Sequence, residues 1–221
     1  YGVTTVPNRR LDLLPNTLKS LVSGGFDKPR LFVDGCTPVV ALEMQDTFQL
    51  PVTPRNPTIR THGNWILSLY ELYIREPHAD RYAIFQDDLV CVKNLRQYLE
   101  QCTYPTNGYW NLYLFDSNAQ LAPKDSNGRT QKGWYLSNQC GRGAVGLVFS
   151  HPAVILLLTS SHMVNRPQDA HRGHKAVDGG IVDSMKKANY QEYVHYPSLT
   201  QHMGYYSAMG NMPHRQSSSF C

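Results

Sequence analysis

Apolar residues along the chain follow two spacings, one typical of buried strands and one typical of helices. Continuous β-prone runs, each predicting a strand, lie at residues 1–6, 30–33, 82–85, 110–115 and 191–197. Apolar residues three and four positions apart, such as Trp65, Leu69 and Leu72, predict amphipathic helices between these runs. The helices are predicted to begin near Pro15, Asn64, Asn94, His151 and Asp178. Strands and helices that alternate in this way indicate an α/β protein.

Two adjacent carboxylates end the strand predicted at residues 82–85. Gln86 follows this strand and precedes Asp87 and Asp88. Ligands of open α/β sheets collect at the carboxyl ends of strands, and two adjacent anions repel each other unless a cation lies between them. Mg²⁺ and Mn²⁺ take carboxylate ligands and share them with substrate phosphates. The pair therefore suggests a metal site, with a solvated turn or a helix cap as the alternative.

Other polar residues and one glycine stand where a ligand could bind. Arg9 and Arg10 follow the first strand, where a nucleotide diphosphate would lie, although a solvated loop would look the same. Asp34 ends the second strand and could accept hydrogen bonds from a base or ribose, or serve an ordinary turn. Asn64 is either a helix cap or a ligand contact. Gly143 lets the backbone approach a ligand closely, or marks a β-bulge.

Asp178 is expected at the start of a helix over residues 176–187. As an N-cap it would contribute about 1 kcal/mol. A carboxylate directed from a helix start into a cleft could also take a proton from an attacking hydroxyl. Both interpretations remain open from the residues alone.

Composition favours one enzyme-sized domain over residues 1–221. The chain is 41% hydrophobic and 17% charged, and no linker interrupts it. A net charge of +4 and a pI near 8.8, with scattered Lys and Arg, suit an anionic small molecule better than a nucleic acid. No apolar run is long enough to span a bilayer. The first residue is Tyr1 rather than Met, which leaves open that a leader, an anchor or a partner domain has been removed.

Segments rich in polar residues are predicted to be loops. Residues 116–132 are predicted to form a mobile surface loop, and the tail from about residue 209 is predicted to be flexible. The five cysteines are widely spaced and include no CxxC pair. This pattern favours free thiols in a reducing compartment, the cytoplasm, over a disulfide framework or a zinc cluster.

The order of several motifs resembles that of the GT-A-fold glycosyltransferases. These motifs are Thr-Thr-Val-Pro-x-Arg at residues 4–9, Asp34-Gly35, Gln86-Asp87-Asp88, a helix led by Asp178, and Pro-Ser-Leu-x-Gln-His-x-Gly at residues 197–204. The likeness covers residues 2–210 and is closest to the N-acetylglucosaminyltransferase IV group, which has Glu-Asp-Asp where this chain has Gln86-Asp87-Asp88. It implies an open, twisted, mostly parallel Rossmann-like sheet flanked by helices.

The resemblance also implies roles for individual residues. Asp88 and His202 would hold a divalent ion, and the nitrogen ligand would favour Mn²⁺ over Mg²⁺. Without the surrounding motif, His202 would be taken for an ordinary loop histidine. Asp178 would be the catalytic base, and Asp183, further along the same helix, is its rival. The nucleotide sugar would be contacted by Thr5, Val6, Arg9, Arg10, Asp34, Asn64, Gln86, Asp87 and Gly143.

The activity that the resemblance implies is metal-dependent glycosyl transfer. The donor would be a nucleoside-diphosphate sugar, with UDP favoured, and the acceptor a hydroxyl of a glycan or another molecule. A single carboxylate base opposite a metal-held leaving group favours inversion, although retention remains open. A metal-dependent nucleotidyltransferase or phosphohydrolase is the second interpretation. A non-catalytic carbohydrate-binding module, suggested by 14 tyrosines and 3 tryptophans, is the third.

Overall fold

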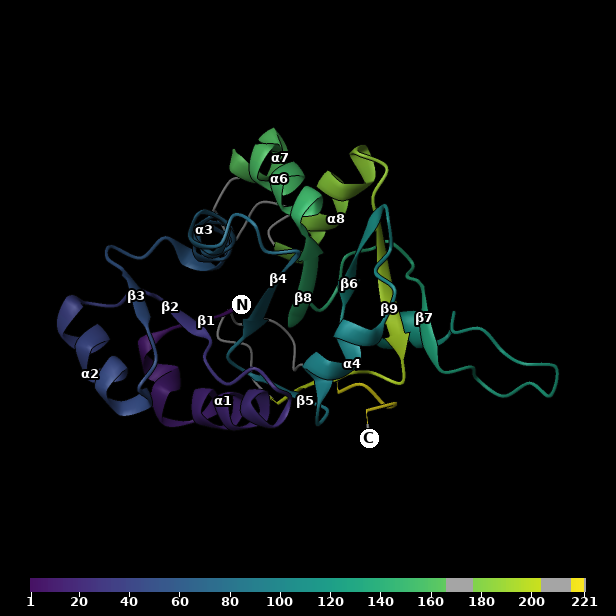
Figure 1. The fold of residues 1–221 in the computed structure, drawn as a ribbon, viewed down its shortest axis with the longest axis horizontal. Helices are drawn as coiled ribbons and strands as arrows, with labels where there is room; N and C mark the ends of the chain where they lie inside the picture. The colour runs from purple at the N-terminus through teal and green to yellow at the C-terminus, as the bar shows by residue number, and fades with distance from the viewer. Residues whose placement is uncertain (166–176, 204–215, 221) are drawn as a thin grey trace.

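The computed structural model describes residues 1–165, 177–203 and 216–220, and it contains one large sheet with helices on both faces (Figure 1). The sheet order is β3-β2-β1-β4-β8-β6-β9-β7, and β5 and β10 form a separate two-stranded ribbon. The strands are β1 (Gly2–Thr5), β2 (Arg30–Asp34), β3 (Val52–Arg55), β4 (Arg81–Gln86), β5 (Leu89–Cys91), β6 (Gly108–Asn111), β7 (Gly133–Leu136), β8 (Gly146–Ser150), β9 (Gln191–Tyr196) and β10 (Thr200–His202).

Most strands of the large sheet run in one direction. Strands β3, β2, β1 and β4 are mutually parallel, and their order is the one that begins a Rossmann sheet. Strand β8 is antiparallel to both β4 and β6, β9 is parallel to β6, and β7 is antiparallel to β9. Strands β7 and β8 therefore run against the other six. The predicted α/β fold, with an open and mostly parallel sheet flanked by helices, is confirmed.

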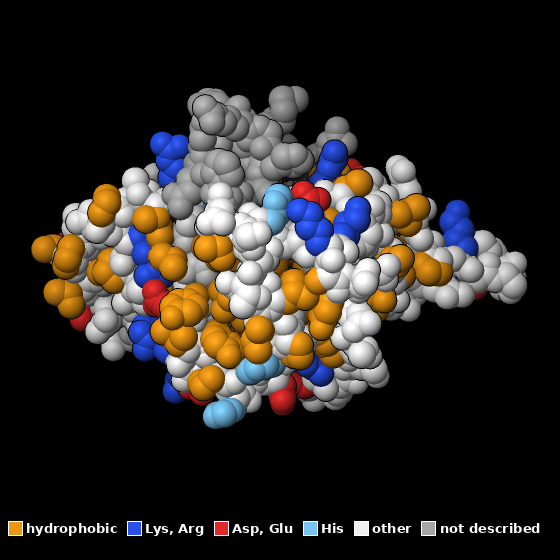
Figure 2. All heavy atoms as spheres, turned by 90° about the horizontal axis from the view of Figure 1, so that it is seen from above, with side chains coloured by type: hydrophobic (Ala, Val, Ile, Leu, Met, Phe, Trp, Pro, Cys, Tyr) orange, Lys and Arg blue, Asp and Glu red, His pale blue; other side chains and the backbone are white. Residues whose placement is uncertain are grey.

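Helices cover the sheet on both sides. They are η1 (Pro7–Leu11), α1 (Leu13–Ser23), α2 (Pro38–Phe48), α3 (Arg60–Arg75), α4 (Leu95–Gln101), α5 (Asp116–Ala119), α6 (His151–Thr159), α7 (Ser161–Val164) and α8 (Val177–Lys187). Figure 1 shows α3, α6, α7 and α8 on one face and α1 and α4 on the other. Figure 2 shows hydrophobic side chains scattered over the surface seen from above. In α3, Tyr70 and Ile74 are exposed.

Each face of the sheet buries its own hydrophobic cluster. In β4, Phe85 packs in the cluster that includes Leu14 and Leu18 of α1, whereas its neighbour Ile84 packs in the cluster that includes Trp65 of α3. Successive strand residues point to opposite faces, and both faces are covered, which is why β4 is apolar at every position. The continuous apolar run in the sequence has this physical cause.

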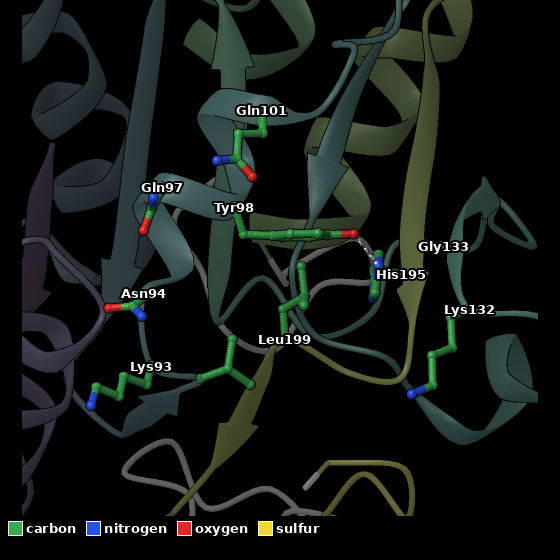
Figure 3. A pocket seen from close by; sticks show the side chains of 10 residues that line it. Lys93, Asn94, Gln97, Tyr98, Gln101, Lys132, Gly133, His195 and Leu199 are labelled. Carbon is green, nitrogen blue, oxygen red and sulfur yellow. Dashed lines mark hydrogen bonds between the residues drawn. The ribbon is translucent and has the colours of Figure 1, made fainter.

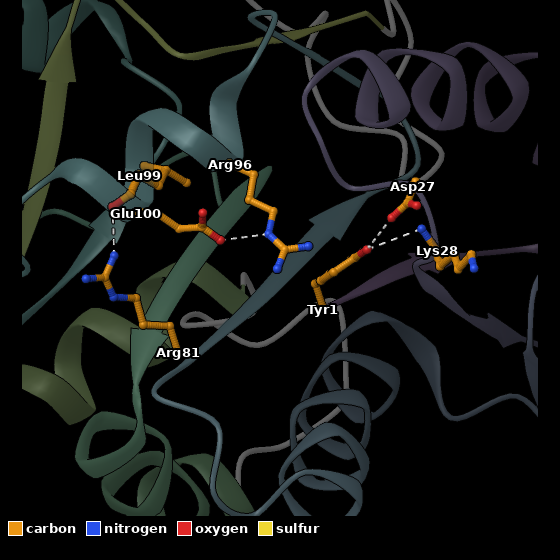
Figure 4. Close-up of polar contacts among 7 residues, drawn as sticks. All are labelled: Tyr1, Asp27, Lys28, Arg81, Arg96, Leu99 and Glu100. Carbon is orange, nitrogen blue, oxygen red and sulfur yellow. Dashed lines mark hydrogen bonds and ion pairs between the residues drawn. The ribbon is translucent and has the colours of Figure 1, made fainter.

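Hydrogen bonds and ring contacts fix α4 against the rest of the sheet (Figure 4). The Arg81 guanidinium donates to the carbonyl oxygen of Leu99 at 2.7 Å, and Arg96 pairs with Glu100 at 2.9 Å. The Arg96 guanidinium also lies 5.8 Å from the centre of the Tyr1 ring. Helix α4 is therefore held in place by Arg81, at the start of β4, and by Tyr1, the residue before β1.

The structure corrects several predicted elements. Helix α2 was not predicted, and strand β3 lies outside the predicted strands. The strand predicted over residues 110–115 is β6, which ends at Asn111, and the polar stretch 116–132 contains the short helix α5. Strand β10, which follows β9, was not among the predicted strands.

Two further predictions concern the chain end and membranes. Much of the tail predicted to be flexible lies outside the described residues, but in residues 216–220 the amide of Ser217 donates to Oε1 of Gln201 in β10 at 2.8 Å. This part of the tail is thus tied to β10. Among the helices described here, none has the length and apolar character needed to cross a membrane.

Cys36, Cys91, Cys102 and Cys140 are free thiols, and Cys221 lies outside the described residues.

Candidate functional site

Polar side chains gather at one edge of the sheet because β1, β2, β4 and β6 run parallel and end there. Thr5 closes β1, Asp34 closes β2, Gln86 closes β4 and Asn111 closes β6. Parallel strands present their carboxyl ends together, which is where ligands of open α/β sheets bind. The sequence predicted Asp34 at the end of a strand and Gln86 directly after one, and in the structure they end β2 and β4. Asn111 was expected inside a strand over residues 110–115 but ends β6.

Asp87 is a buried carboxylate that the first strand and the first helix hold in place. The Thr5 hydroxyl donates to its Oδ2 at 2.6 Å, and the Thr17 hydroxyl donates to its main-chain oxygen at 2.7 Å. Burial, and then the neighbouring charge of Asp88, raise the pKa of Asp87 to about 7, while Thr5 and Arg9 act in the opposite direction. An added cation would favour the charged form, so metal ions and protons compete at this end of β4.

The ribbon of β5 and β10 brings Asp88 and His202 together. In this ribbon His202 lies opposite Leu89, the residue that follows Asp88. Nε2 of His202 lies 3.5 Å from Oδ2 of Asp88, and both side chains are more than nine-tenths buried. Had these residues been on opposite sides of the molecule, a shared ion would have been impossible. Instead, two residues far apart in sequence meet because of a strand pairing.

The Asp88–His202 pair has the chemistry expected of ligands to one divalent ion. Two ligands each about 2.1 Å from an ion and roughly 90–110° apart are separated by about 3.0–3.4 Å. The observed 3.5 Å is close to this value and longer than the 2.7–3.2 Å of a good N–H···O hydrogen bond. Oδ1 of Asp88 is buried and has no hydrogen-bond partner among the described residues. Buried carboxylate oxygens normally have a partner, so this atom is suited to a ligand.

A third protein ligand does not join the pair within residues 1–165, 177–203 and 216–220. No group of three or more His, Cys, Asp or Glu side chains in those residues is arranged to hold a metal ion. Mg²⁺ and ions like it are commonly held by one or two carboxylates, with the remaining positions taken by water and substrate phosphates. The residues present therefore fit an ion that is completed by a bound phosphate group rather than one caged by protein.

Asp178 lies at the same edge of the sheet, attached to the glycine loop before β8. The amide of Gly143 donates to its Oδ2 at 3.0 Å, and the amide of Gly179 donates to its Oδ1 at 3.1 Å. Two residues after Gly143, the carbonyl of Val145 accepts from the amide of Gln86 at 2.8 Å. Asp178 is thereby tied to the strand end that carries the carboxylate pair. It stands in the first turn of the described α8.

Gly143 is required for close contact within the chain. Its φ of +75° is strained for residues with a side chain, and a Cβ there would overlap the ring of Tyr113. The sequence suggested that this glycine lets the backbone approach a ligand. The observed close approach is to Tyr113, with the amide turned toward Asp178.

Asp183, the rival base, points elsewhere. Five residues along an α-helix correspond to a rotation of about 140°, so Asp178 and Asp183 face different directions on α8. The Asp183 side chain is 41% exposed, and its Oδ2 lies 3.8 Å from Nε2 of His162 in α7. The structure therefore does not bring Asp183 to the glycine loop that holds Asp178.

Other predicted nucleotide contacts bond within the chain. Asp34 accepts from the Thr58 hydroxyl at 2.6 Å and from the Ile59 amide at 2.8 Å, which anchors the loop before α3. Asn64 is not a helix cap, because α3 begins at Arg60, and its side-chain amide donates to the carbonyl of Phe32 at 3.0 Å. The hydrogen bonds of Asp34 and Asn64 therefore hold the loop before α3 and helix α3 against β2.

The two arginines in the segment after β1 have different contacts. The Arg10 guanidinium donates to the carbonyl oxygen of Pro7 at 3.0 Å, and the carbonyl oxygen of Val6 accepts from the amide of Arg9 at 3.1 Å. The charge of Arg9 lowers the pKa of Asp87. Arg9 is therefore the cation of this loop that acts on the carboxylate pair.

Sequence reasoning missed a buried acid beneath Asp178. Glu192 of β9 is 2% exposed, and its Oε2 accepts from the Tyr109 hydroxyl at 3.0 Å and from the Asn111 amide at 3.2 Å. Burial, and the nearby charge of Asp178, raise the pKa of Glu192. The signal in the sequence was the two-residue period of β9, which puts Glu192 on the same face as buried Val194.

Replacing Glu192 by glutamine is expected to make stability less dependent on pH. The folded protein holds the Glu192 proton more tightly than the unfolded chain does, so the wild-type free energy of unfolding falls as pH rises from the ordinary carboxyl pKa through the raised one. Glutamine cannot ionise and can still accept from Tyr109 and Asn111. Urea denaturation at pH 5 and pH 8 should show Glu192→Gln gaining stability relative to wild type at the higher pH.

The matched control for this measurement is Glu43→Gln, at an exposed position of α2. It should follow the wild-type pH dependence. Equal behaviour of the two variants would mean that Glu192 does not hold its proton in the folded protein.

Comparison with known proteins finds only distant structural likeness. No protein-family model matches the sequence, and a search of curated proteins finds no match. HddC from Yersinia pseudotuberculosis is similar with a TM-score of 0.48 and 9% identity, covering 89% of this chain and 92% of HddC. A putative glucose-1-phosphate thymidylyltransferase from Bacillus anthracis gives a TM-score of 0.47 and 10% identity, covering 91% of this chain and 89% of that one.

A third similar structure is the apo-form glycosyltransferase GlyE of Streptococcus pneumoniae TIGR4, with a TM-score of 0.46 and 11% identity. The match covers 86% of this chain but only 44% of GlyE. By name, the neighbours thus include a glycosyltransferase and a nucleotidyltransferase. Likenesses this distant do not assign an activity, and they give no support to the narrower resemblance to the N-acetylglucosaminyltransferase IV group.

Proposed function

We propose that this protein is a metal-dependent glycosyltransferase that moves a sugar from a nucleoside-diphosphate sugar, with UDP favoured, to a hydroxyl acceptor. The observation that carries the proposal is the approach of His202 to Asp88 at the carboxyl edge of the sheet. A carboxylate and an imidazole form a donor set that suits Mn²⁺, with Mg²⁺ as the alternative. The incomplete protein ligand set leaves positions for a diphosphate.

The reaction needs charge stabilisation at the leaving group. Breaking the bond between the sugar and the diphosphate adds negative charge to an already anionic group. A bound divalent ion supplies Lewis-acid stabilisation of that charge, worth several kcal/mol. Asp88 and His202 would hold the ion, and Arg9, whose charge already reaches Asp87, would add a second positive charge near the phosphates.

The buried position of Asp87 suits a role in orienting the nucleotide. The Thr5 hydroxyl fixes Oδ2 of Asp87 at 2.6 Å, and a carboxylate fixed in this way can accept from a ribose hydroxyl or from a metal-bound water. Thr5 thus acts on the donor through Asp87. Val6 and Gln86 flank these two residues in the sequence.

Asp178 is proposed as the general base. Gly143 and Gly179 each donate one amide to its carboxylate, which fixes the side chain at the start of the helix. A hydroxyl acceptor that loses its proton to Asp178 would attack the sugar carbon from the side opposite the diphosphate. This arrangement inverts the configuration at that carbon and requires no covalent intermediate.

The two other function classes fit the same residues less well. Two-metal phosphoryl transfer needs a larger set of acidic ligands, and the described residues contain no group of three. A carbohydrate-binding module has no use for a buried carboxylate with a partnerless oxygen beside an imidazole. Both observations favour the transferase.

The test is donor turnover. We expect the protein to release UDP from at least one UDP-sugar in a panel of nucleotide sugars when Mn²⁺ is present, by slow hydrolysis without an acceptor. Release should stop in EDTA and return on adding Mn²⁺. Turnover that is unaffected by EDTA, or cleavage between the phosphates instead of at the sugar, would contradict the proposal.

A further inference from the structure

A cavity on the α4 side of the sheet is separate from the residues assigned above. It has a volume of about 580 Å³ and lies between α4, the end of β9 and the segment that enters β7 (Figure 3). None of the residues assigned above to the nucleotide sugar, the ion or the base lines it. Its lining contains two lysines and no Asp or Glu.

Three amide side chains from one side of α4 line this cavity. They belong to Asn94, Gln97 and Gln101. None of the three amides makes a side-chain hydrogen bond to another described residue. Each amide offers two donors and an acceptor, the groups that bind sugar hydroxyls by paired hydrogen bonds. Three such groups line one side of the cavity without side-chain partners among the described residues, and they are available to a ligand rich in hydroxyls.

The wall between the amides and β9 is aromatic and rigid. The Tyr98 hydroxyl and Nε2 of His195 are 2.6 Å apart, and Nδ1 of His195 lies 2.7 Å from the carbonyl oxygen of Pro197. Burial lowers the pKa of His195, so the ring is neutral at neutral pH. A carbonyl only accepts, so Nδ1 carries the hydrogen and Nε2 accepts from Tyr98. The ring of Trp134 packs edge-on against His195, with ring centres 5.1 Å apart.

Two lysines stand on different sides of the cavity. Figure 3 shows Lys93 on the side of Asn94 and Lys132 on the side of β7. Neither has an ion-pair partner among the described residues. With no acid in the lining, the cavity carries positive charge, which attracts anions and disfavours cations.

We infer that this cavity binds an anionic carbohydrate, with hydroxyls on the amides, an apolar sugar face against Tyr98, and an acidic group between the lysines. Each part of this ligand matches one feature of the lining. A neutral sugar would leave the two ammonium groups without a counter-ion, and a small inorganic anion would leave the three amides unused.

The cavity connects with the proposed metal site through the β5–β10 ribbon. The amide of Val92 donates to the carbonyl of Leu199 at 3.1 Å, and both residues line the cavity. Val92 is three positions after Leu89, which lies opposite His202, and three positions correspond to about 10 Å along a strand. If the proposed function holds, the bound carbohydrate is the acceptor. Binding in the cavity does not depend on that function.

The experiment is a calorimetric titration of the complete chain with trigalacturonate, which carries carboxylates, and with a heparin-derived tetrasaccharide, which carries sulfates as well. Maltotriose is the neutral probe. We expect at least one acidic probe to bind with an affinity that falls as salt rises, and maltotriose to bind at least tenfold more weakly. The double variant Lys93→Ala/Lys132→Ala should weaken acidic binding about fivefold or more.

Gln97→Ala should weaken the acidic probe without changing the salt dependence, because it removes an amide and no charge. Lys19→Ala, at an exposed position of α1, is the matched control and should bind as wild type does. Absence of binding by both acidic probes at millimolar concentration would overturn the inference. Equal weakening by Lys19→Ala and by the double variant would also overturn it.

Asp88→Asn separates this inference from the proposed function. Acidic carbohydrate binding should survive in this variant even though metal-dependent nucleotide binding is lost. Carbohydrate binding without any UDP binding in wild type would refute the transferase and leave the cavity assignment standing. UDP binding without carbohydrate binding would refute the cavity assignment and leave the transferase proposal standing.

Discussion

Asp88→Asn is expected to abolish Mn²⁺-dependent binding of UDP, with a loss of at least about 100-fold in affinity. The substitution keeps the size of the side chain and removes its charge. Oδ2 of Asp88 lies 3.5 Å from Nε2 of His202, and Oδ1 is buried without a hydrogen-bond partner, so the carboxylate is available to the ion. Once the charge is gone, the imidazole of His202 is left as the remaining half of the pair. Isothermal titration with UDP, with and without Mn²⁺, measures the effect.

The control for this titration is Asp27→Asn. Asp27 is an exposed residue that accepts from the Tyr1 hydroxyl at 3.1 Å, far in sequence from the carboxylate pair. It should bind Mn²⁺ and UDP as wild type does. The wild-type affinity should also rise with pH through about 7, where Asp87 loses the proton that competes with the ion. Unchanged binding in Asp88→Asn would remove Asp88 from the site.

Asp178→Asn is expected to lower the transfer rate by about 10²–10⁴-fold, the usual contribution of a general base, with little change in UDP affinity. Asparagine can still accept from the amide of Gly143, so the glycine loop should keep its conformation. It cannot take a proton from the acceptor. The measurement is steady-state transfer to an acceptor found in a screen, beside UDP titration of the same preparation.

Asp183→Asn is the matched control on the same helix. Its ion pair with His162 is near the surface, so its removal should change neither the rate nor the UDP affinity appreciably. A collapse of transfer in Asp183→Asn, with Asp178→Asn active, would reverse the assignment of the base. Equal loss of UDP binding and of transfer in Asp178→Asn would instead indicate a damaged binding site.

The sequence predicted those parts of the fold whose periodicity is local and strong. Strand β4 and helix α3 were found because their apolar residues are buried on covered faces. Helix α2 was missed because its apolar residues do not form a single inward stripe. Val39 and Leu42 are more than 60% exposed, while Ala41 and Met44 are buried.

The sequence predicted the candidate site only where its residues are neighbours in the chain. The carboxylate pair after β4 has a local signature, and its position at the sheet edge follows from parallel strands. The approach of His202 depends on the pairing of two strands of three residues each, β5 and β10, which no local pattern encodes. The resemblance to a family suggested His202 as the partner of Asp88, and the folded structure shows how far apart the two side chains are.

Buried polar residues were the least predictable part of the site. Asn111 and Glu192 join β6 and β9 beneath Asp178, and a glutamate in a strand ordinarily faces solvent. Only the register of β9 against β6 turns Glu192 inward beside Tyr109. Long-range pairing of this kind is a property of the folded chain, and a single sequence does not display it.

Pulsed electron paramagnetic resonance of bound Mn²⁺ can show whether one divalent ion is bound by both Asp88 and His202. In the presence of UDP, the wild-type protein should show ¹⁴N coupling from a coordinated imidazole. The coupling should disappear in His202→Gln and persist in His162→Gln. Absence of nitrogen coupling in wild type, or its persistence in His202→Gln, would contradict the account.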